Sequence, residues 1–191
     1  FAKFVNSKIS LNSDILEIGC GNGRDSFFFS KNHHSVSGFD TSLTAIEGCL
    51  LESKNSLVSN SINFCHDNIL SFSEKFPDFK FDLIYCRFTF NAMTLAEELE
   101  FLSLAPILLK NKGKLFIECR SINDPLARSG EIVSATERVN GHYRRFIIAK
   151  ELQSRLNAHG FTTEHFLESN GLSLHEGEDP VLIRICAKHN T

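Results

Sequence analysis

Short runs of apolar residues alternate along the chain with longer stretches in which apolar residues recur at helical spacing. The short runs predict β-strands and the longer stretches predict α-helices. The expected strands cover about 14–18, 35–39, 61–65, 81–85, 114–118, 161–168 and 181–187. The expected helices cover about 24–32, 43–53, 94–110 and 148–159.

Capping residues support several of these helix boundaries. Thr94 followed by Glu97 has the spacing of a capping box, and either Thr41 or Ser42 is a suitable N-cap for the predicted helix 43–53. Pro106 lies inside the predicted helix 94–110 and is expected to kink it. Gly160 follows the last predicted helix, which is typical of a helix C-terminus.

The order of these elements predicts the fold class. Strands that alternate with helices form a mainly parallel sheet, because right-handed crossovers place helices on both of its faces. The last two predicted strands have no helix between them, so they can pair antiparallel. The fold class is therefore α/β.

Residues 121–143 interrupt the alternation. The segment is polar, carries Pro125, Gly130 and Gly141, and is longer than connections usually are. We expect a loop or small excursion that acts as a lid on a single domain spanning 1–191.

Composition and charge narrow the classes of function. A chain of 191 residues suits one domain that buries ~70% of its unfolded surface. Its formal net charge of −3 makes a nucleic-acid partner an unfavoured alternative. No apolar run approaches the ~20 residues of a membrane span, and the first residues do not form a secretory signal. We therefore expect no membrane association.

The six cysteines favour a cytoplasmic location. None forms a C-x-x-C pair and most lie in apolar runs, which indicates buried free thiols in a reducing compartment. The chain begins with Phe1 rather than Met, which is compatible with a longer protein that has a further domain upstream.

A glycine-rich turn follows the first predicted strand. Gly19, Gly21 and Gly23 allow a tight turn and close backbone approach to a ligand, at the N-terminus of the next helix. The dinucleotide fingerprint G-x-G-x-x-G requires glycine at position 24, where this chain has Arg24. Glu17, before the turn, would repel a pyrophosphate but attract an ammonium group. A nicotinamide-dependent oxidoreductase is therefore a weaker alternative.

Two further acids follow the next two strands. Asp40 closes the second predicted strand, where a carboxylate can accept hydrogen bonds from both ribose hydroxyls. Asp67 follows the third, where it can accept from an adenine amino group. Together with Glu17, these acids would face one crevice at the carboxyl ends of adjacent strands.

The segment 15–23 resembles the first motif of the class I S-adenosylmethionine-dependent methyltransferases. The resemblance implies a Rossmann-like, doubly wound, seven-stranded sheet with its last strand antiparallel. It also implies that Glu17 and the turn 19–23 contact the methionine part of the cofactor S-adenosylmethionine, Asp40 the ribose and Asp67 the adenine. The cofactor-binding residues expected on this basis are Glu17, Gly19, Cys20, Gly21, Asn22, Gly23, Asp40, Thr41, Asp67, Asn68 and Cys86. The segment 21–25 is also similar to tellurite-resistance and thiopurine methyltransferases, which act on small molecules.

The sequence after the fourth strand excludes three subclasses of acceptor. Residues 85–91 contain neither the (Asp/Asn)-Pro-Pro-(Tyr/Phe) motif of adenine or glutamine methylation nor the Pro-Cys nucleophile of cytosine methylation. The Asp that would hold Mg²⁺ in catechol-type enzymes is also missing, and Arg87 lies nearby instead. We expect no metal site.

Cationic residues follow several strand ends and predict the acceptor. Arg87 and Arg120 follow the fourth and fifth strands, and Arg144 follows the polar excursion. Because arginine side chains bind carboxylates and phosphates, these three arginines predict a small anionic acceptor. Alternatively, Arg144 and Arg145 pair with surface acids such as Glu131 or Glu137.

Two residues of the same region are candidates for acid–base chemistry. His142 and Tyr143 can act as general base if the acceptor is protonated at neutral pH.

A different alternative remains, in which the chain is a non-catalytic cofactor-binding module that regulates a longer protein.

Overall fold

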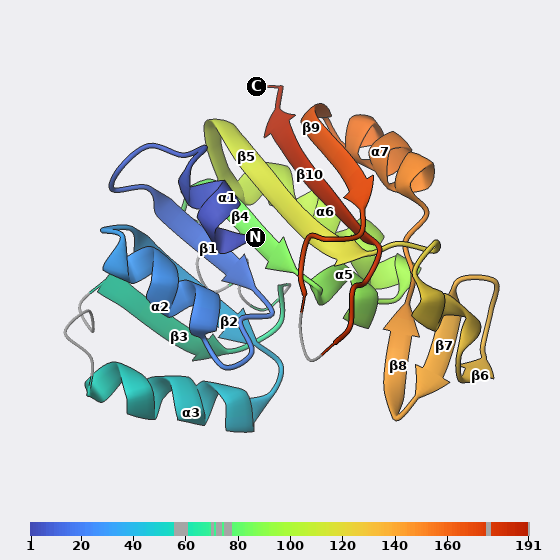
Figure 1. The fold of residues 1–191 in the computed structure, drawn as a ribbon. Coiled ribbons are helices and arrows are strands. Elements are labelled where there is room, and N and C mark those ends of the chain that lie inside the picture. Colours follow the sequence, from blue (N-terminus) through green and yellow to red (C-terminus); the bar gives the residue numbers. More distant parts are fainter. Residues whose placement is uncertain (56–60, 70, 72–73, 75–77, 175–176, 191) are drawn as a thin grey trace.

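A seven-stranded sheet forms the centre of the computed structural model, which describes residues 1–55, 61–69, 71, 74, 78–174 and 177–190 (Figure 1). Its strand order is β3-β2-β1-β4-β5-β10-β9. The strands are β1 (Asp14–Ile18), β2 (Ser35–Asp40), β3 (Ile62–His66), β4 (Phe81–Arg87), β5 (Leu109–Arg120), β9 (Phe161–Ser169) and β10 (Leu182–His189). The first five pair in parallel, and β10 pairs antiparallel with both β5 and β9.

Helices cover both faces of the sheet. They are α1 (Ala2–Asn6), α2 (Arg24–Lys31), α3 (Leu43–Lys54), α5 (Thr89–Ala92), α6 (Leu95–Leu108) and α7 (Ala149–Ala158). In Figure 1, α1 and α2 lie in front of the sheet and α6 lies behind it. Each face has its own hydrophobic cluster, one built with residues of α1 and α2 and the other with residues of α6 and α7.

Strand β4 shows why the central strands appear as continuous apolar runs in the sequence. Leu83 and Tyr85 belong to the cluster under α1 and α2, whereas Ile84 and Cys86 belong to the cluster under α6 and α7. Successive side chains alternate between two buried faces, so no polar position interrupts the run.

The predicted α/β fold is confirmed, including the mainly parallel sheet and its antiparallel last strand. The capping box is confirmed as well, because the Thr94 side chain accepts from the Glu97 amide and the Glu97 carboxylate accepts from the Thr94 amide. Strand β5 begins at Leu109, earlier than predicted, because the polar residues 110–113 look like a turn although they extend the strand.

The segment 121–143 contains short elements that the sequence analysis did not predict. They are a 3-10 helix (Pro125–Arg128) and the strands β6 (Glu131–Ile132), β7 (Glu137–Asn140) and β8 (His142–Arg145). These strands form a small antiparallel sheet beside the large one (Figure 1). The action of this segment as a lid stays a prediction.

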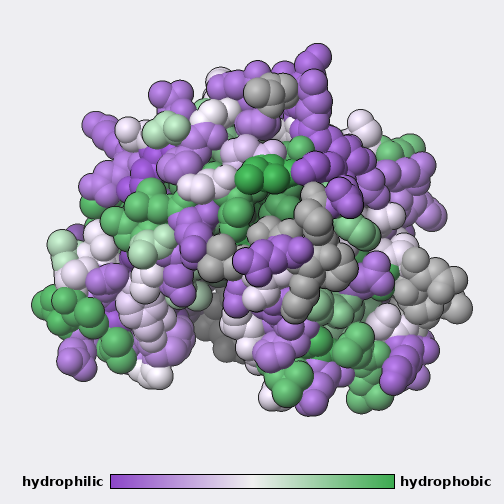
Figure 2. All heavy atoms as spheres, turned by 180° about the vertical axis from the view of Figure 1, so that it is seen from behind, coloured by the Kyte–Doolittle hydropathy of each residue, from purple (hydrophilic) through white to green (hydrophobic). Residues whose placement is uncertain are grey.

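Seen from behind, the surface carries hydrophobic patches separated by hydrophilic residues (Figure 2). On α6, the side chains of Leu95, Leu99 and Ile107 are exposed. Among the described residues, no helix is both long and apolar enough to cross a membrane.

Candidate active site

The turn between β1 and α2 requires its glycines. Gly19, Gly21 and Gly23 have φ angles of 70°, 52° and 73°, in the left-handed region that favours glycine. A Cβ atom on Gly19 would lie 2.8 Å from Thr89 Oγ1, and one on Gly23 would lie 2.9 Å from Cys49 Sγ. At Gly21 a Cβ would meet nothing within 4 Å. The turn is therefore packed on two sides and leaves the backbone at Gly21 accessible.

Asp40 connects this turn to the end of β2. Its Oδ2 accepts a hydrogen bond from the Gly21 amide at 2.8 Å, and its Oδ1 accepts from the Ser42 amide at 2.8 Å. The carboxylate is thereby oriented, and each oxygen keeps a lone pair for a further donor.

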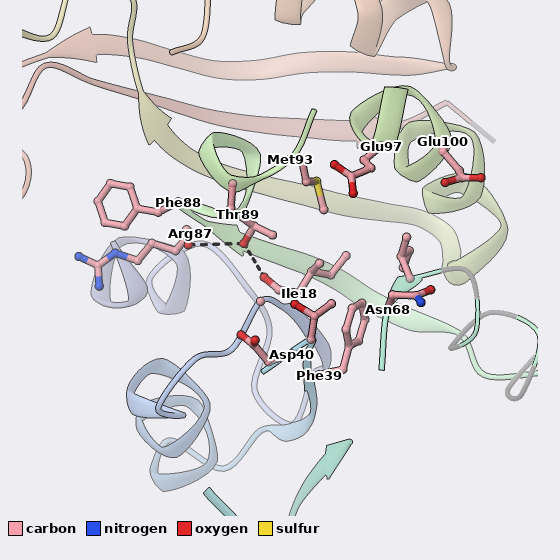
Figure 3. Close-up of a pocket in the computed structure, with 14 residues that line it drawn as sticks. Ile18, Phe39, Asp40, Asn68, Arg87, Phe88, Thr89, Met93, Glu97 and Glu100 are labelled. Atoms are coloured by element: carbon pink, nitrogen blue, oxygen red, sulfur yellow. Dashed lines mark hydrogen bonds between the residues drawn. The ribbon is translucent and has the colours of Figure 1, made fainter. Parts of the chain in front are cut away.

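A cavity of about 550 Å³ opens at the carboxyl ends of β1, β2 and β4 (Figure 3). Four of the predicted cofactor-binding residues line it, namely Gly19, Asp40, Thr41 and Asn68. The rest of its lining consists of Ile18, Phe39, Ile69, Arg87, Phe88, Thr89, Ala92, Met93, Glu97 and Glu100. Thr89 fixes one wall, since its hydroxyl donates to the Ile18 carbonyl at 2.6 Å.

A smaller recess of about 90 Å³ adjoins this cavity and shares Gly19, Arg87 and Phe88 with it. Glu17, Cys20, Asn22, Arg24 and Asp25 complete its lining. The recess therefore combines two carboxylates and two guanidinium groups in a small volume.

Glu17 is almost completely buried at the end of β1, with 4% of its surface exposed. The Ser26 hydroxyl donates a hydrogen bond to its carboxylate. Burial raises the pKa of Glu17 to about 8, the Ser26 hydrogen bond opposes this rise, and the charge of Asp25 adds to it. A cation in the recess would favour the ionised form of Glu17.

Asp25 is a site residue that the sequence analysis did not single out. Its Oδ2 accepts from the Tyr85 hydroxyl at 2.7 Å and from Arg87 Nη1 at 3.3 Å. Burial, followed by the neighbouring charge of Asp25, raises the pKa of Tyr85. The sequence feature that could have identified Asp25 is its position in the first turn of α2, directly after the glycine turn.

Of the remaining predicted cofactor-binding residues, two line the recess and three line neither cavity. Asn22 and Cys20 line the recess, whereas Gly23 packs against Cys49 on α3. Asp67 is buried next to the cavity, where its Oδ1 accepts from the Asn68 amide at 2.9 Å. Cys86 is fully buried and lines neither cavity.

The Arg87 guanidinium is held by three partners. Its Nε donates to Glu118 Oε1 at 2.9 Å, its Nη1 to Asp25 at 3.3 Å, and its Nη2 to Ser173 Oγ at 3.2 Å. Two carboxylates thus neutralise the arginine that lies at the junction of cavity and recess.

Arg120 and Arg144 line neither cavity. Arg120 donates to the Asp124 carboxylate at 3.2 Å and to Glu178 at 2.8 Å. Arg144 Nη2 lies 2.7 Å from His142 Nε2. The structure does not bring these two arginines together with Arg87 around one ligand cavity.

Arg145 does not pair with Glu131 or Glu137, contrary to the alternative prediction. It is buried and forms an ion pair with the buried carboxylate of Glu98 on α6, which also accepts from Arg155 Nε at 2.6 Å. Arg145 forms this pair because its side chain points from β8 into the protein interior.

Tyr143 and His142 lie on β8, outside the lining of both cavities. The Tyr143 hydroxyl donates to Glu137 Oε1 at 2.6 Å. Burial and this hydrogen bond raise the pKa of Tyr143 to about 12. The proposed role of either residue as general base stays a prediction.

Comparisons with known proteins agree with this geometry. The model of the family described as "Methyltransferase domain" matches residues 9–167. No curated protein sequence matches the chain.

Several solved structures share the fold. A SAM-dependent methyltransferase from Methanosarcina mazei has a TM-score of 0.79 and 18% identity, over 97% of this chain and 96% of that chain. The CcbJ methyltransferase from Streptomyces caelestis has a TM-score of 0.80 and 14% identity, and the match covers 100% of this chain and 88% of that chain. The 1,6-didemethyltoxoflavin-N1-methyltransferase of Burkholderia thailandensis, solved with 1,6-didemethyltoxoflavin and S-adenosylhomocysteine, has a TM-score of 0.77 and 15% identity, over 100% and 76%.

The family match covers most of the chain, and the seven-stranded sheet is the one that the resemblance implied. The chain belongs to the methyltransferase domain family, as a class I S-adenosylmethionine-dependent methyltransferase.

Proposed function

We propose that this chain transfers the methyl group of S-adenosylmethionine to a small molecule bound in the 550 Å³ cavity. The observation that carries the proposal is the adjacency of this cavity and the recess, which share Gly19, Arg87 and Phe88 at the carboxyl ends of β1 and β4. Ligands of open α/β sheets bind at this edge. Family membership weighs against the alternative of a nicotinamide-dependent oxidoreductase.

The residues present fit the cofactor's chemical groups. Asp40 is oriented by two amides and has acceptor capacity left for ribose hydroxyls. The carboxylates of Glu17 and Asp25 suit an ammonium group in the recess. The open side of Gly21 allows backbone approach without a steric clash.

When bound, S-adenosylmethionine supplies a methyl group on a positively charged sulfur. The chain's own residues would orient the reactants and exclude water, and such positioning supplies most of the acceleration in a displacement of this kind. Gly19, Arg87 and Phe88 line both the recess and the larger cavity, so an acceptor would lie next to them.

A small-molecule acceptor is supported by the size of the cavity, which lies in the range of about 300–1,000 Å³ typical of such sites. The Burkholderia methyltransferase was solved with the small molecule 1,6-didemethyltoxoflavin bound. The anionic acceptor predicted from the arginines has weaker support, because Arg87 and Arg120 already contact carboxylates. Five of the cysteines are free thiols, namely Cys20, Cys49, Cys86, Cys119 and Cys186, which supports a reducing, cytoplasmic environment.

Calorimetry with S-adenosylhomocysteine tests the donor site directly. We expect saturable binding by the parent chain and a loss of about tenfold or more in Asp40→Ala, since two oriented acceptor atoms disappear. Glu47→Gln is a matched control, because Glu47 is exposed on α3 and lines neither cavity. Absence of binding by the folded parent chain, or equal affinity in Asp40→Ala, would contradict the proposal.

A further inference from the structure

The wall of the cavity that faces Asp40 is acidic. Glu97 and Glu100, both on α6, line this wall beside Met93, and Figure 3 shows the three side chains across the cavity from Phe39 and Asp40. The wall is therefore built from apolar surface and two carboxylates.

These carboxylates have acceptor atoms available. Glu97 uses Oε2 in the helix cap, where it accepts from the Thr94 amide at 2.7 Å and from the Thr94 hydroxyl at 2.8 Å. Within the described part of the chain, neither Glu97 Oε1 nor the Glu100 carboxylate has a hydrogen bond or an ion pair. Both residues are exposed to solvent and line the cavity.

The nearby cations do not offset this negative charge. Arg87 is the cationic residue in the described lining of the cavity, and Glu118 and Asp25 already neutralise it. Arg145 and Arg155 lie near α6, but both bind the buried Glu98. The lining therefore has an excess of carboxylates: Asp40 on one side, Glu97 and Glu100 on the other.

We propose that the methyl acceptor carries a positively charged amine, which Glu97 and Glu100 recognise, while Asp40 serves the donor. This inference rests on the proposed function and names the class of its substrate. Carboxylates at the opening attract a cationic ligand and repel an anionic one, so the charge of this wall selects between two acceptors of the same shape.

Matched pairs of ligands test the proposal. Tyramine and 4-hydroxyphenylacetate share a skeleton and differ in an ammonium or a carboxylate, as do benzylamine and benzoate. Binding of each is measured by calorimetry to the chain saturated with S-adenosylhomocysteine. We expect each amine to bind more tightly than its matched carboxylate.

The variant Glu97→Gln/Glu100→Gln isolates the charge. Glutamine at position 97 can still form the capping box, so the helix start is kept. We expect the amines to bind about tenfold more weakly, the sum of two partly exposed charge interactions, with S-adenosylhomocysteine bound as before. Glu47→Gln on α3 controls for the loss of a negative charge elsewhere and should change neither affinity.

Two results would overturn the inference: amines that bind no more tightly than their matched carboxylates, or amines that bind the double variant as tightly as the parent. Failure of the parent to bind S-adenosylhomocysteine would instead overturn the proposed function, so the two failures can be told apart.

Discussion

At the scale of single residues, Glu17 combines burial with a position beside the proposed ammonium site. Its pKa of about 8 means that the carboxyl group is mostly protonated at pH 7 in the free chain. A bound ammonium group stabilises the ionised form and lowers this pKa, so donor binding and loss of the Glu17 proton are linked.

We predict that S-adenosylhomocysteine binding at pH 7 releases nearly one proton and strengthens as the pH rises from 6 towards 8.5. Calorimetry in Tris and in phosphate measures the release, because these buffers take up protons with different enthalpies. Glu17→Gln, which has no proton to lose, should show the same binding enthalpy in both buffers. Equal enthalpies for the parent chain would contradict the linkage.

The backbone of Phe88 lies in the left-handed region, which glycine adopts more readily than other residues. Its φ is 60° and its ψ is −2°, at the N-cap of α5, and it lines both the cavity and the recess. A bulky residue in the left-handed region is strained by about 1–2 kcal/mol. The conformation is held by the Phe88 amide, which donates to the Glu118 carbonyl at 2.7 Å, and the Arg87 guanidinium lies 5.2 Å from the ring centroid.

Comparing Phe88→Gly with Phe88→Ala separates this strain from the loss of the ring. Both variants lose the ring, but only glycine relieves the backbone, so we expect the glycine variant to be the more stable by about 1 kcal/mol. Urea denaturation measures the difference. At Glu47, inside α3, alanine should instead be more stable than glycine by about 1 kcal/mol. If the alanine variant were more stable than the glycine variant at position 88 as well as at position 47, the backbone at position 88 would not be strained.

At the scale of elements, one buried carboxylate connects three strands and a loop. Glu118 on β5 is fully buried and accepts from Arg87 on β4 at 2.9 Å and from Arg184 on β10 at 2.5 Å. Arg184 also donates to the Leu172 carbonyl at 2.8 Å, in the connection between β9 and β10. The position of Arg87 beside the recess therefore depends on Glu118.

We predict that Glu118→Gln lowers the free energy of unfolding by about 3–5 kcal/mol, since it removes the buried charge that the guanidinium groups of Arg87 and Arg184 share. Donor affinity should fall as well, because Arg87 would lose one of the two carboxylates that hold it at the recess. Chemical denaturation and calorimetry measure the two effects. Glu164→Gln removes a partner of Lys114 in a partly exposed ion pair and should cost no more than about 1 kcal/mol. A similarly small cost at Glu118 would contradict its role.

The elements that sequence patterns predict are those with enough length to show a period. Strands β1 and β4 and helix α6 have apolar runs or caps of their own, so they were predicted. Helix α5 spans Thr89–Ala92 and β6 spans Glu131–Ile132, too short to show any periodicity. The glycine turn and Asp40 could be identified because their chemistry is local. The partners of Arg87 could not, because Asp25 and Glu118 approach it only through the order of the strands.

At the scale of the whole molecule, buried ion pairs connect the small sheet to helices that pack on the large sheet. Glu98 on α6 is fully buried between Arg145 of β8 and Arg155 of α7. Asn91 on α5 adds a second connection, since its amide donates to the Arg145 carbonyl at 2.6 Å and to the Arg120 carbonyl at 3.1 Å. The wall of the cavity near α5 is thereby fixed to the small sheet.

The proposed donor site exists only in the folded chain, because β1, β2 and β4 contribute to it and are far apart in sequence. A ligand that binds the folded state alone stabilises it by mass action. At about 100 times its dissociation constant, S-adenosylhomocysteine should add about 2.7 kcal/mol to the free energy of unfolding. For a chain of this length, that corresponds to a rise in Tm of roughly 5–10 °C.

Thermal unfolding followed by circular dichroism checks this expectation. At the same ligand concentration, Asp40→Ala should show a much smaller rise than the parent, because the weakened site is far from saturation. Glu97→Gln/Glu100→Gln should keep the full rise, since those carboxylates are assigned to the acceptor and not to the donor. If the double variant lost the rise as Asp40→Ala does, the two walls of the cavity would serve the same ligand. The division of the cavity between donor and acceptor would then be wrong, even though the donor itself binds.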